Sequence, residues 1–172
     1  MITVRAAISA DAPEVVRLRR VMFQAMTGRD EPGPWEEAAE KLLREQLSGQ
    51  GELTTGVFVV DADGPGGGLA ACAVGTVEQR LPAPGHPTGR FGFIFSICTD
   101  PAYRGRGYAR MVTEALLDWL AERGVTRVDL HATADAEHLY RELGFSDHSV
   151  ALSLDVSKRR AAALGAVGRD SP

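Results

Sequence analysis

The sequence contains little of what an exported, membrane-spanning or nucleic-acid-binding protein needs. It has two cysteines in 172 residues, and both fall inside apolar segments, which favours reduced core residues in a cytoplasmic protein. No apolar run approaches the roughly 18 residues of a membrane span, and the N-terminal residues lack the apolar region of a signal peptide. The net charge of −4 argues against general binding to nucleic acids or to anionic membranes.

Clustered metal ligands are missing as well. His131 and His138 could be combined with Asp135, but their spacing matches no helix-face pair and no cysteine joins them. We predict no metal site and interpret the two histidines as structural residues. Cys98 has no neighbouring base in the sequence, which disfavours an acyl-carrying nucleophile at that position.

Length and periodicity predict one catalytic domain of residues 1–157, followed by a loosely ordered tail of residues 158–172. The predicted strands are Thr3–Ala7, Gly56–Asp61, Leu69–Glu78, Phe91–Thr99, Thr126–Ala132 and a last one with alternating Val150, Leu152 and Leu154. The predicted helices begin at Asp11–Glu14, span Trp35–Leu47 and Tyr108–Arg123, and lie within Ala134–Phe145. The order of elements indicates an α+β fold with a mixed, mostly antiparallel central sheet and helices on both faces.

The most informative segment lies between the strand that ends at Thr99 and the helix that begins at Tyr108. It reads Asp-Pro-Ala-Tyr-Arg-Gly-Arg-Gly from residue 100 to residue 107. A glycine-rich turn before a helix offers free backbone N–H groups and the positive end of the helix dipole to an anion. Gly105 and Gly107 permit close approach to the backbone, and Arg104 and Arg106 add charged donors. We predict a pyrophosphate-binding site here.

Two common phosphate-binding motifs do not fit this segment. A P-loop requires a lysine that is absent, and a dinucleotide fingerprint requires a third glycine where Arg110 stands. The segment resembles instead motif A of the GNAT superfamily of acetyl-CoA-dependent N-acetyltransferases, Q/R-x-x-G-x-G/A, with Arg104, Gly107 and Ala109 at its defined positions. The alternative is that this segment is only an Arg/Gly turn that caps an ordinary helix, since such a turn contains the same residue types.

A second match supports the resemblance. Leu139-Tyr-Arg-Glu-Leu-Gly-Phe145 is similar to the L-Y-x-x-L-G-F ending of the same superfamily's motif B. The two motifs are in the expected order and cover, with their neighbouring elements, about residues 91–154.

The resemblance implies a mode of acetyl-CoA binding. In the GNAT fold, strands four and five run parallel and splay apart, and a bulge in strand four exposes backbone groups to the pantetheine arm. In this sequence the backbone of Ile97, Cys98 and Thr99 would contact that arm. The pyrophosphate would be held by Arg104, Gly105, Arg106, Gly107, Tyr108 and Ala109.

The resemblance also implies a catalytic acid. Amide formation needs a neutral amine, a donor to the tetrahedral oxyanion and an acid for the leaving thiolate. Tyr140 stands where motif B places that acid, and a phenol is protonated at neutral pH. The alternative is that Tyr140 is an aromatic packing residue beside Phe145.

The sequence departs from the family pattern at two places. Asp135 stands where an asparagine often contacts the pantetheine arm, so it either accepts a hydrogen bond there or caps the last helix. Strand four has no glutamate to act as the base. Glu78 and His86 are the candidates to replace this base. The alternative is that each is an ordinary surface residue.

Together these features predict a cytoplasmic N-acetyltransferase that transfers the acetyl group directly, in a ternary complex, to a primary amine of a small molecule or a peptide. Asp30, Glu31 and Glu78 would attract the cationic amine. The last strand offers an edge for a homodimer. The alternative function is a catalytically idle acyl-CoA-binding regulator of the same fold. Tyr140 favours the enzyme, whereas the missing strand-four carboxylate leaves the regulator open.

Overall fold

The structure is a computed structural model that describes residues 1–49, 52–157 and 159. Apart from the predicted last strand, its elements follow the predicted order, and their ends fall close to the predicted ones. The strands are β1 (Val4–Ala6), β2 (Thr55–Asp61), β3 (Leu69–Gln79), β4 (Arg90–Thr99) and β5 (Arg127–Leu130). The helices are α1 (Ala12–Thr27), α2 (Pro34–Ser48), α3 (Tyr108–Glu122) and α4 (Ala134–Glu142), with short 3-10 turns η1 (Ser9–Asp11) and η2 (Pro101–Tyr103).

The five strands form one sheet in the order β1-β2-β3-β4-β5. Every neighbouring pair is antiparallel except β4 and β5, which are parallel. The parallel pair is possible because α3 crosses over between its two strands. The predicted mixed, mostly antiparallel sheet is confirmed.

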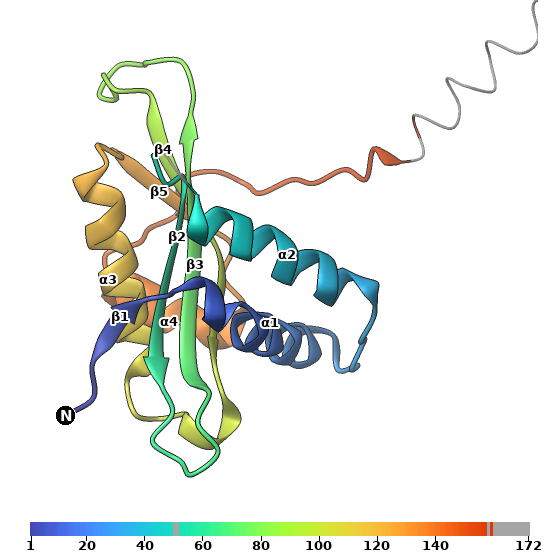
Figure 1. The fold of residues 1–172 in the computed structure, drawn as a ribbon. Helices are drawn as coiled ribbons and strands as arrows, with labels where there is room; N and C mark the ends of the chain where they lie inside the picture. The colour runs from blue at the N-terminus through green and yellow to red at the C-terminus, as the bar shows by residue number, and fades with distance from the viewer. Residues whose placement is uncertain (50–51, 158, 160–172) are drawn as a thin grey trace, which may run out of the picture.

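Helices cover both faces of the sheet, as predicted (Figure 1). Alternation along β2 divides the core between them, since successive side chains point to opposite faces. Val57 and Val59 pack in one buried cluster with Leu18 of α1. Val60 packs in a second cluster with Leu116 of α3. The sheet is therefore a rigid layer between two apolar cores, and its strand ends can carry a site.

The predicted final strand is not formed. The side chains of Val150, Leu152 and Leu154 are 83%, 90% and 72% exposed, and the segment after α4 runs away from the body as an extended chain (Figure 1). The alternating pattern is typical of a strand, but a strand needs a neighbour to satisfy its backbone. In the described part of the chain the segment pairs with none, and β5 has no partner on its outer edge.

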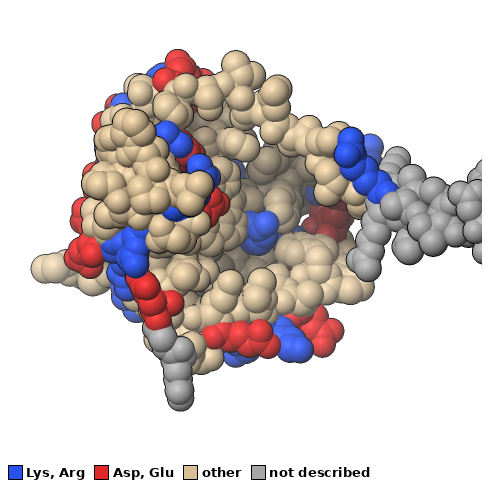
Figure 2. All heavy atoms as spheres, turned by 90° about the horizontal axis from the view of Figure 1, so that it is seen from above, with Lys and Arg blue, Asp and Glu red and all other residues tan. Residues whose placement is uncertain are grey.

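The tail predicted for residues 158–172 lies outside the described residues, apart from Arg159. The division into a domain of residues 1–157 and a tail stays a prediction. Within the described ranges, no helix is long and apolar enough to cross a membrane. Figure 2 shows acidic and basic side chains interspersed over one face, with a hollow between them.

Candidate active site

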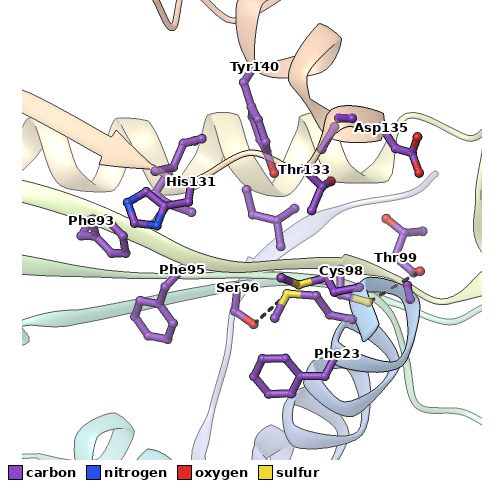
Figure 3. Close-up of a pocket in the computed structure, with 18 of the residues that line it drawn as sticks. Phe23, Phe93, Phe95, Ser96, Cys98, Thr99, His131, Thr133, Asp135 and Tyr140 are labelled. Carbon is purple, nitrogen blue, oxygen red and sulfur yellow. Dashed lines mark hydrogen bonds between the residues drawn. The ribbon is translucent and has the colours of Figure 1, made fainter. Parts of the chain in front are cut away.

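A cavity opens where β4 and β5 stop pairing. The parallel pairing runs from Phe91 with Arg127 to Ile94 with Leu130, while β4 continues to Thr99. The end of β4, the second half of α1 and the start of α4 enclose a cavity of about 780 Å3 (Figure 3). The two strands part as predicted, and the end of β4 has no β5 partner beside it.

A bulge in β4 lies at the entrance to this gap. Val74 of β3 pairs with Ser96, but the next residue, Gly75, pairs with Ile94. Phe95 is therefore the extra residue on β4, and a bulge of this kind turns a side chain out of the regular alternation. Its ring is 41% exposed and lines the cavity. The bulge implied by the family resemblance is confirmed.

Ile97, Cys98 and Thr99 all line the cavity, as expected for the segment that would contact the pantetheine arm. The cysteines are free, and burial raises the pKa of the Cys98 thiol to about 11. Cys72 is enclosed in the core, where burial raises its pKa to about 12. A thiol with so high a pKa is a poor nucleophile at neutral pH, so the geometry gives no support to an acyl-cysteine.

The segment Arg104–Ala109, here called the cradle loop, leads into α3. Gly105 and Gly107 have φ angles of +76° and +79°, which an L side chain rarely adopts. A Cβ at either glycine would meet no atom within 4 Å, so the space beside the backbone is open. Gly107 is the N-cap of α3 and no side chain caps the helix. The first-turn N–H groups thus remain available to an anion.

The two arginines of the cradle loop differ in their partners. Arg104 lines the cavity and makes no ion pair with any described residue. Arg106 lies 3.6 Å from Asp63, and its guanidinium lies over the ring of Tyr103. Tyr108 was predicted to bind the cofactor, but its side chain is 3% exposed and packs in the core. Only the backbone of Tyr108 can therefore serve an anion.

Tyr140 extends from α4 toward β4, with its hydroxyl foremost (Figure 3). The side chain is 9% exposed, lines the cavity and stands edge-on to Phe145, with ring centroids 6.0 Å apart. Burial raises the pKa of its phenol above the ordinary value, which keeps the group protonated at neutral pH. The residue combines the packing role with access to the cavity.

Asp135 lies in the first turn of α4 and lines the cavity. The N-cap of this helix is Thr133, so the predicted alternative of a cap at Asp135 is wrong. Neither the Thr133 side chain nor any other caps the helix. The Asp135 carboxylate is exposed at the end of the cavity that also contains Thr99 (Figure 3).

None of the acids proposed for the amine lines the cavity. Glu78 is paired with Arg80 at 2.6 Å, and Asp30 is paired with Arg20 at 2.6 Å. The side chain of Glu31 does not reach the cavity either.

His86, the other base suggested by the sequence, is hydrogen-bonded through Nδ1 to Thr126 Oγ1 at 2.8 Å, in the loop that follows β3.

His131 is the cavity residue that sequence reasoning missed. It follows β5 directly, lines the cavity and stands edge-on to Phe93, with ring centroids 5.4 Å apart. Figure 3 shows it between Phe93 and Tyr140. A single histidine just beyond a strand gives almost no signal in a sequence, because its neighbours are set by the parting of β4 and β5.

Apolar side chains from α1 form the wall opposite α4. Met22, Phe23 and Met26 line this wall, next to Phe95. Ser96 donates from its hydroxyl to the Met22 sulfur at 3.8 Å. In the described ranges, no group of three or more His, Cys, Asp or Glu side chains is placed to hold a metal ion.

The fold is shared by solved acetyltransferases. A predicted acetyltransferase from Clostridium acetobutylicum, solved with acetyl-CoA, superposes with a TM-score of 0.76 over 92% of this chain and 98% of that one, at 21% identity. Glucosamine-6-phosphate N-acetyltransferase from Arabidopsis thaliana gives a TM-score of 0.69 over 90% of this chain and 98% of its own, at 20% identity.

Sequence relatives carry related names. Glucosamine 6-phosphate N-acetyltransferase 1 of Oryza sativa is 28% identical over 70% of each chain. Mycothiol acetyltransferase of Beutenbergia cavernae is 35% identical over 55% of this chain but 29% of its own. The chain thus spans less than a third of the length of that relative. Residues 20–145 match the model of the acetyltransferase (GNAT) family, and the chain belongs to this family of acyl-transferring enzymes.

Proposed function

We propose that the protein transfers an acetyl group from acetyl-CoA to a primary amine of a small molecule or peptide, directly and within a ternary complex. The observation that carries this proposal is the continuity of one cavity. It runs along the end of β4 that has no β5 partner and contains Arg104 of the cradle loop and Tyr140. Relatives named for glucosamine 6-phosphate and mycothiol support a small-molecule amine.

The residues fit acetyl-CoA at both ends of the cavity. Arg104 and the N-terminal amides of α3 would hold the pyrophosphate, because they are unpaired donors beside open space. The backbone of residues 97–99 would bind the pantetheine arm. Asp135, when ionised, has no donor and would only accept a hydrogen bond from the arm. Acetyl-CoA supplies the activated acyl group as a thioester.

The chemistry balances with two proton transfers. The amine nitrogen forms a bond to the thioester carbonyl carbon, and the bond from that carbon to sulfur breaks. The amine loses a proton to a base, and Tyr140 gives a proton to the leaving thiolate. We assign the base to His131, directly or through water, because an imidazole accepts protons at neutral pH and this one lies in the cavity.

Thiol release from acetyl-CoA, measured across polyamines, aminoglycosides, amino acids and peptides, tests the activity. Intersecting initial-velocity lines are expected for a ternary complex, and Cys98→Ala should retain kcat. Binding of CoA without turnover of any amine would favour the alternative, an idle acyl-CoA-binding regulator. That alternative has one observation in its favour: Asp135 is the only carboxylate among the described residues that line the cavity.

We also propose that the protein works as a homodimer in the cytoplasm. The exposed, alternating apolar segment of Val150, Leu152 and Leu154 is extended without a strand beside it, and the outer edge of β5 has no partner in the described part of the chain. A second copy would satisfy both, since the segments would exchange symmetrically. The two buried, free cysteines agree with a reducing compartment.

A further inference from the structure

Arg19 places a positive charge against the apolar wall of the cavity. Its guanidinium carbon lies 4.7 Å from the ring centroid of Phe23 and 5.5 Å from that of Phe95. Both rings line the cavity, and Figure 3 shows them on the side of β4 that faces away from α4. Arg19 is not itself a lining residue, so its charge lies next to the rings of the α1 wall, whereas Arg104 of the cradle loop lines the cavity.

This charge has no counterion in the described part of the chain. Arg19 makes no ion pair there, and its Nη1 atom is buried without a hydrogen-bond partner. Burial lowers the pKa of the Arg19 guanidinium, and the group that opposes this shift is the Cys72 thiol rather than a carboxylate. A half-buried guanidinium without an acid is unusual, because desolvation of a charge is costly unless it is paired.

The next residue on the helix shows the usual arrangement. Arg20 donates to both oxygens of Asp30, at 2.6 Å each, and lies 3.5 Å from Glu36. Arg17, one turn earlier, is paired with Glu14 and Asp100. Acids of α1, α2 and two loops thus pair with the arginines on both sides of Arg19, whereas Arg19 makes no ion pair in the described part of the chain.

Stacking on the two phenyl rings explains only part of how the Arg19 guanidinium is stabilised without an acid. Cation–π contacts stabilise the faces of the guanidinium, but its N–H donors lie in the plane of the group, and the buried Nη1 donates to no described residue. A planar fork of donors matches a carboxylate or a phosphate. We infer that the acceptor amine carries an anionic group, a carboxylate or a phosphate, which Arg19 binds at the α1 wall. This inference rests on the proposed function and gives its substrate a chemical class.

Matched acceptor pairs test the inference. Phenylalanine and phenylalaninamide form the carboxylate arm, and glucosamine 6-phosphate and glucosamine form the phosphate arm. We expect wild type to prefer the anionic member of at least one pair in kcat/KM. Arg19→Met should lower that preference about ten- to hundredfold, mainly through KM, while kcat/KM for the neutral member stays unchanged. The two amines within a pair differ in basicity, which changes kcat/KM by itself. The ratio of kcat/KM values within each pair is therefore compared between wild type and Arg19→Met.

Two further variants separate binding from structure. Arg19→Lys keeps the charge but not the fork and should retain part of the preference. Arg20→Met removes a neighbouring, fully paired arginine and should leave the preference intact. Calorimetric titration of the anionic acceptors into wild type and Arg19→Met gives a readout that needs no turnover.

The outcomes distinguish this inference from the proposed function. If acceptors are acetylated but Arg19→Met keeps the wild-type preference, or wild type prefers the neutral members, the anion site is wrong and the acetyltransferase stands. If no amine is acetylated, the proposed function fails, and calorimetry still decides whether Arg19 binds the anion.

Discussion

Arg17 of α1 donates a hydrogen bond of 2.7 Å from Nη1 to Oδ2 of Asp100, the first residue after β4. The same guanidinium donates to the Leu69 carbonyl of β3 at 3.0 Å, and Asp100 accepts from the Ala102 N–H at 2.9 Å. One side chain thus joins a helix, a strand and the turn that precedes the cradle loop. The start of the predicted pyrophosphate site is fixed by this contact.

Arg17→Met should therefore reduce both stability and CoA affinity. We expect the free energy of unfolding to fall by about 1 kcal/mol, since the hydrogen bonds are charged but the side chain is partly exposed. Urea unfolding and CoA titration measure the two effects. Arg80→Met is the control, because its partner Glu78 is also exposed and lies outside the cavity. Equal losses of CoA affinity in both variants would contradict the role of Arg17.

Gly107→Glu should abolish CoA binding. The substitution introduces a side chain with negative charge where the open space and α3 amides would receive the pyrophosphate. We expect CoA to raise the melting temperature of wild type but not of this variant. Gly124→Glu is the matched control, because Gly124 also has a positive φ, +74°, at the other end of α3. If CoA raised the melting temperatures of Gly107→Glu and Gly124→Glu equally, the cradle loop would not bind the pyrophosphate.

Tyr140→Phe should keep CoA affinity and lower kcat about 10²- to 10⁴-fold, as expected for loss of a general acid. The ring that packs on Phe145 is preserved. Because burial raises the phenol pKa above its ordinary value, wild-type activity should rise with pH as the amine deprotonates and fall only above about pH 10. Glu78→Gln should cost less than Tyr140→Phe. If Tyr140→Phe retained the wild-type kcat, Tyr140 would have only a packing role and would not be the general acid.

Acid should weaken the fold through Arg5. It donates to Asp11 at 2.7 Å and to Asp61 at 2.6 Å, and these hydrogen bonds lower the pKa of both carboxyls. A lowered pKa stabilises the folded state above the unfolded pKa near 4, and this contribution disappears as pH falls through the folded values. We expect the melting temperature to drop from pH 5 to about pH 2.5, and less steeply in Arg5→Met. An identical pH slope in both proteins would contradict this assignment.

The assembly proposal predicts a dimer mass by light scattering at tens of micromolar. Leu152→Asp should yield a monomer, because it places a charge in the apolar stripe of the exchanged segment. Leu81→Asp is the control, since Leu81 is also exposed, at 88%, but lies in the loop after β3. A wild-type monomer would overturn the proposal.

Part of the site could be predicted because it depends on local sequence. The glycines and arginines of the cradle loop act through backbone freedom and charge next to a helix start, and these properties belong to six consecutive residues. The periodicities of 2 and 3.6 residues located the strands and helices for the same reason. The bulge and the parting of β4 and β5 came from the resemblance rather than from periodicity.

Tertiary structure decided the rest, because those properties depend on neighbours distant in the chain. The alternation at Val150–Leu154 predicted a strand of this sheet, and that prediction is wrong. A strand needs another strand beside it, and alternation alone does not provide one. His131 enters the cavity because β5 ends where β4 continues. Arg19 and Arg20 are adjacent and chemically identical, yet one faces two aromatic rings and the other an aspartate. The sequence determined which residues could bind an anion, and packing determined which of them lacks a partner.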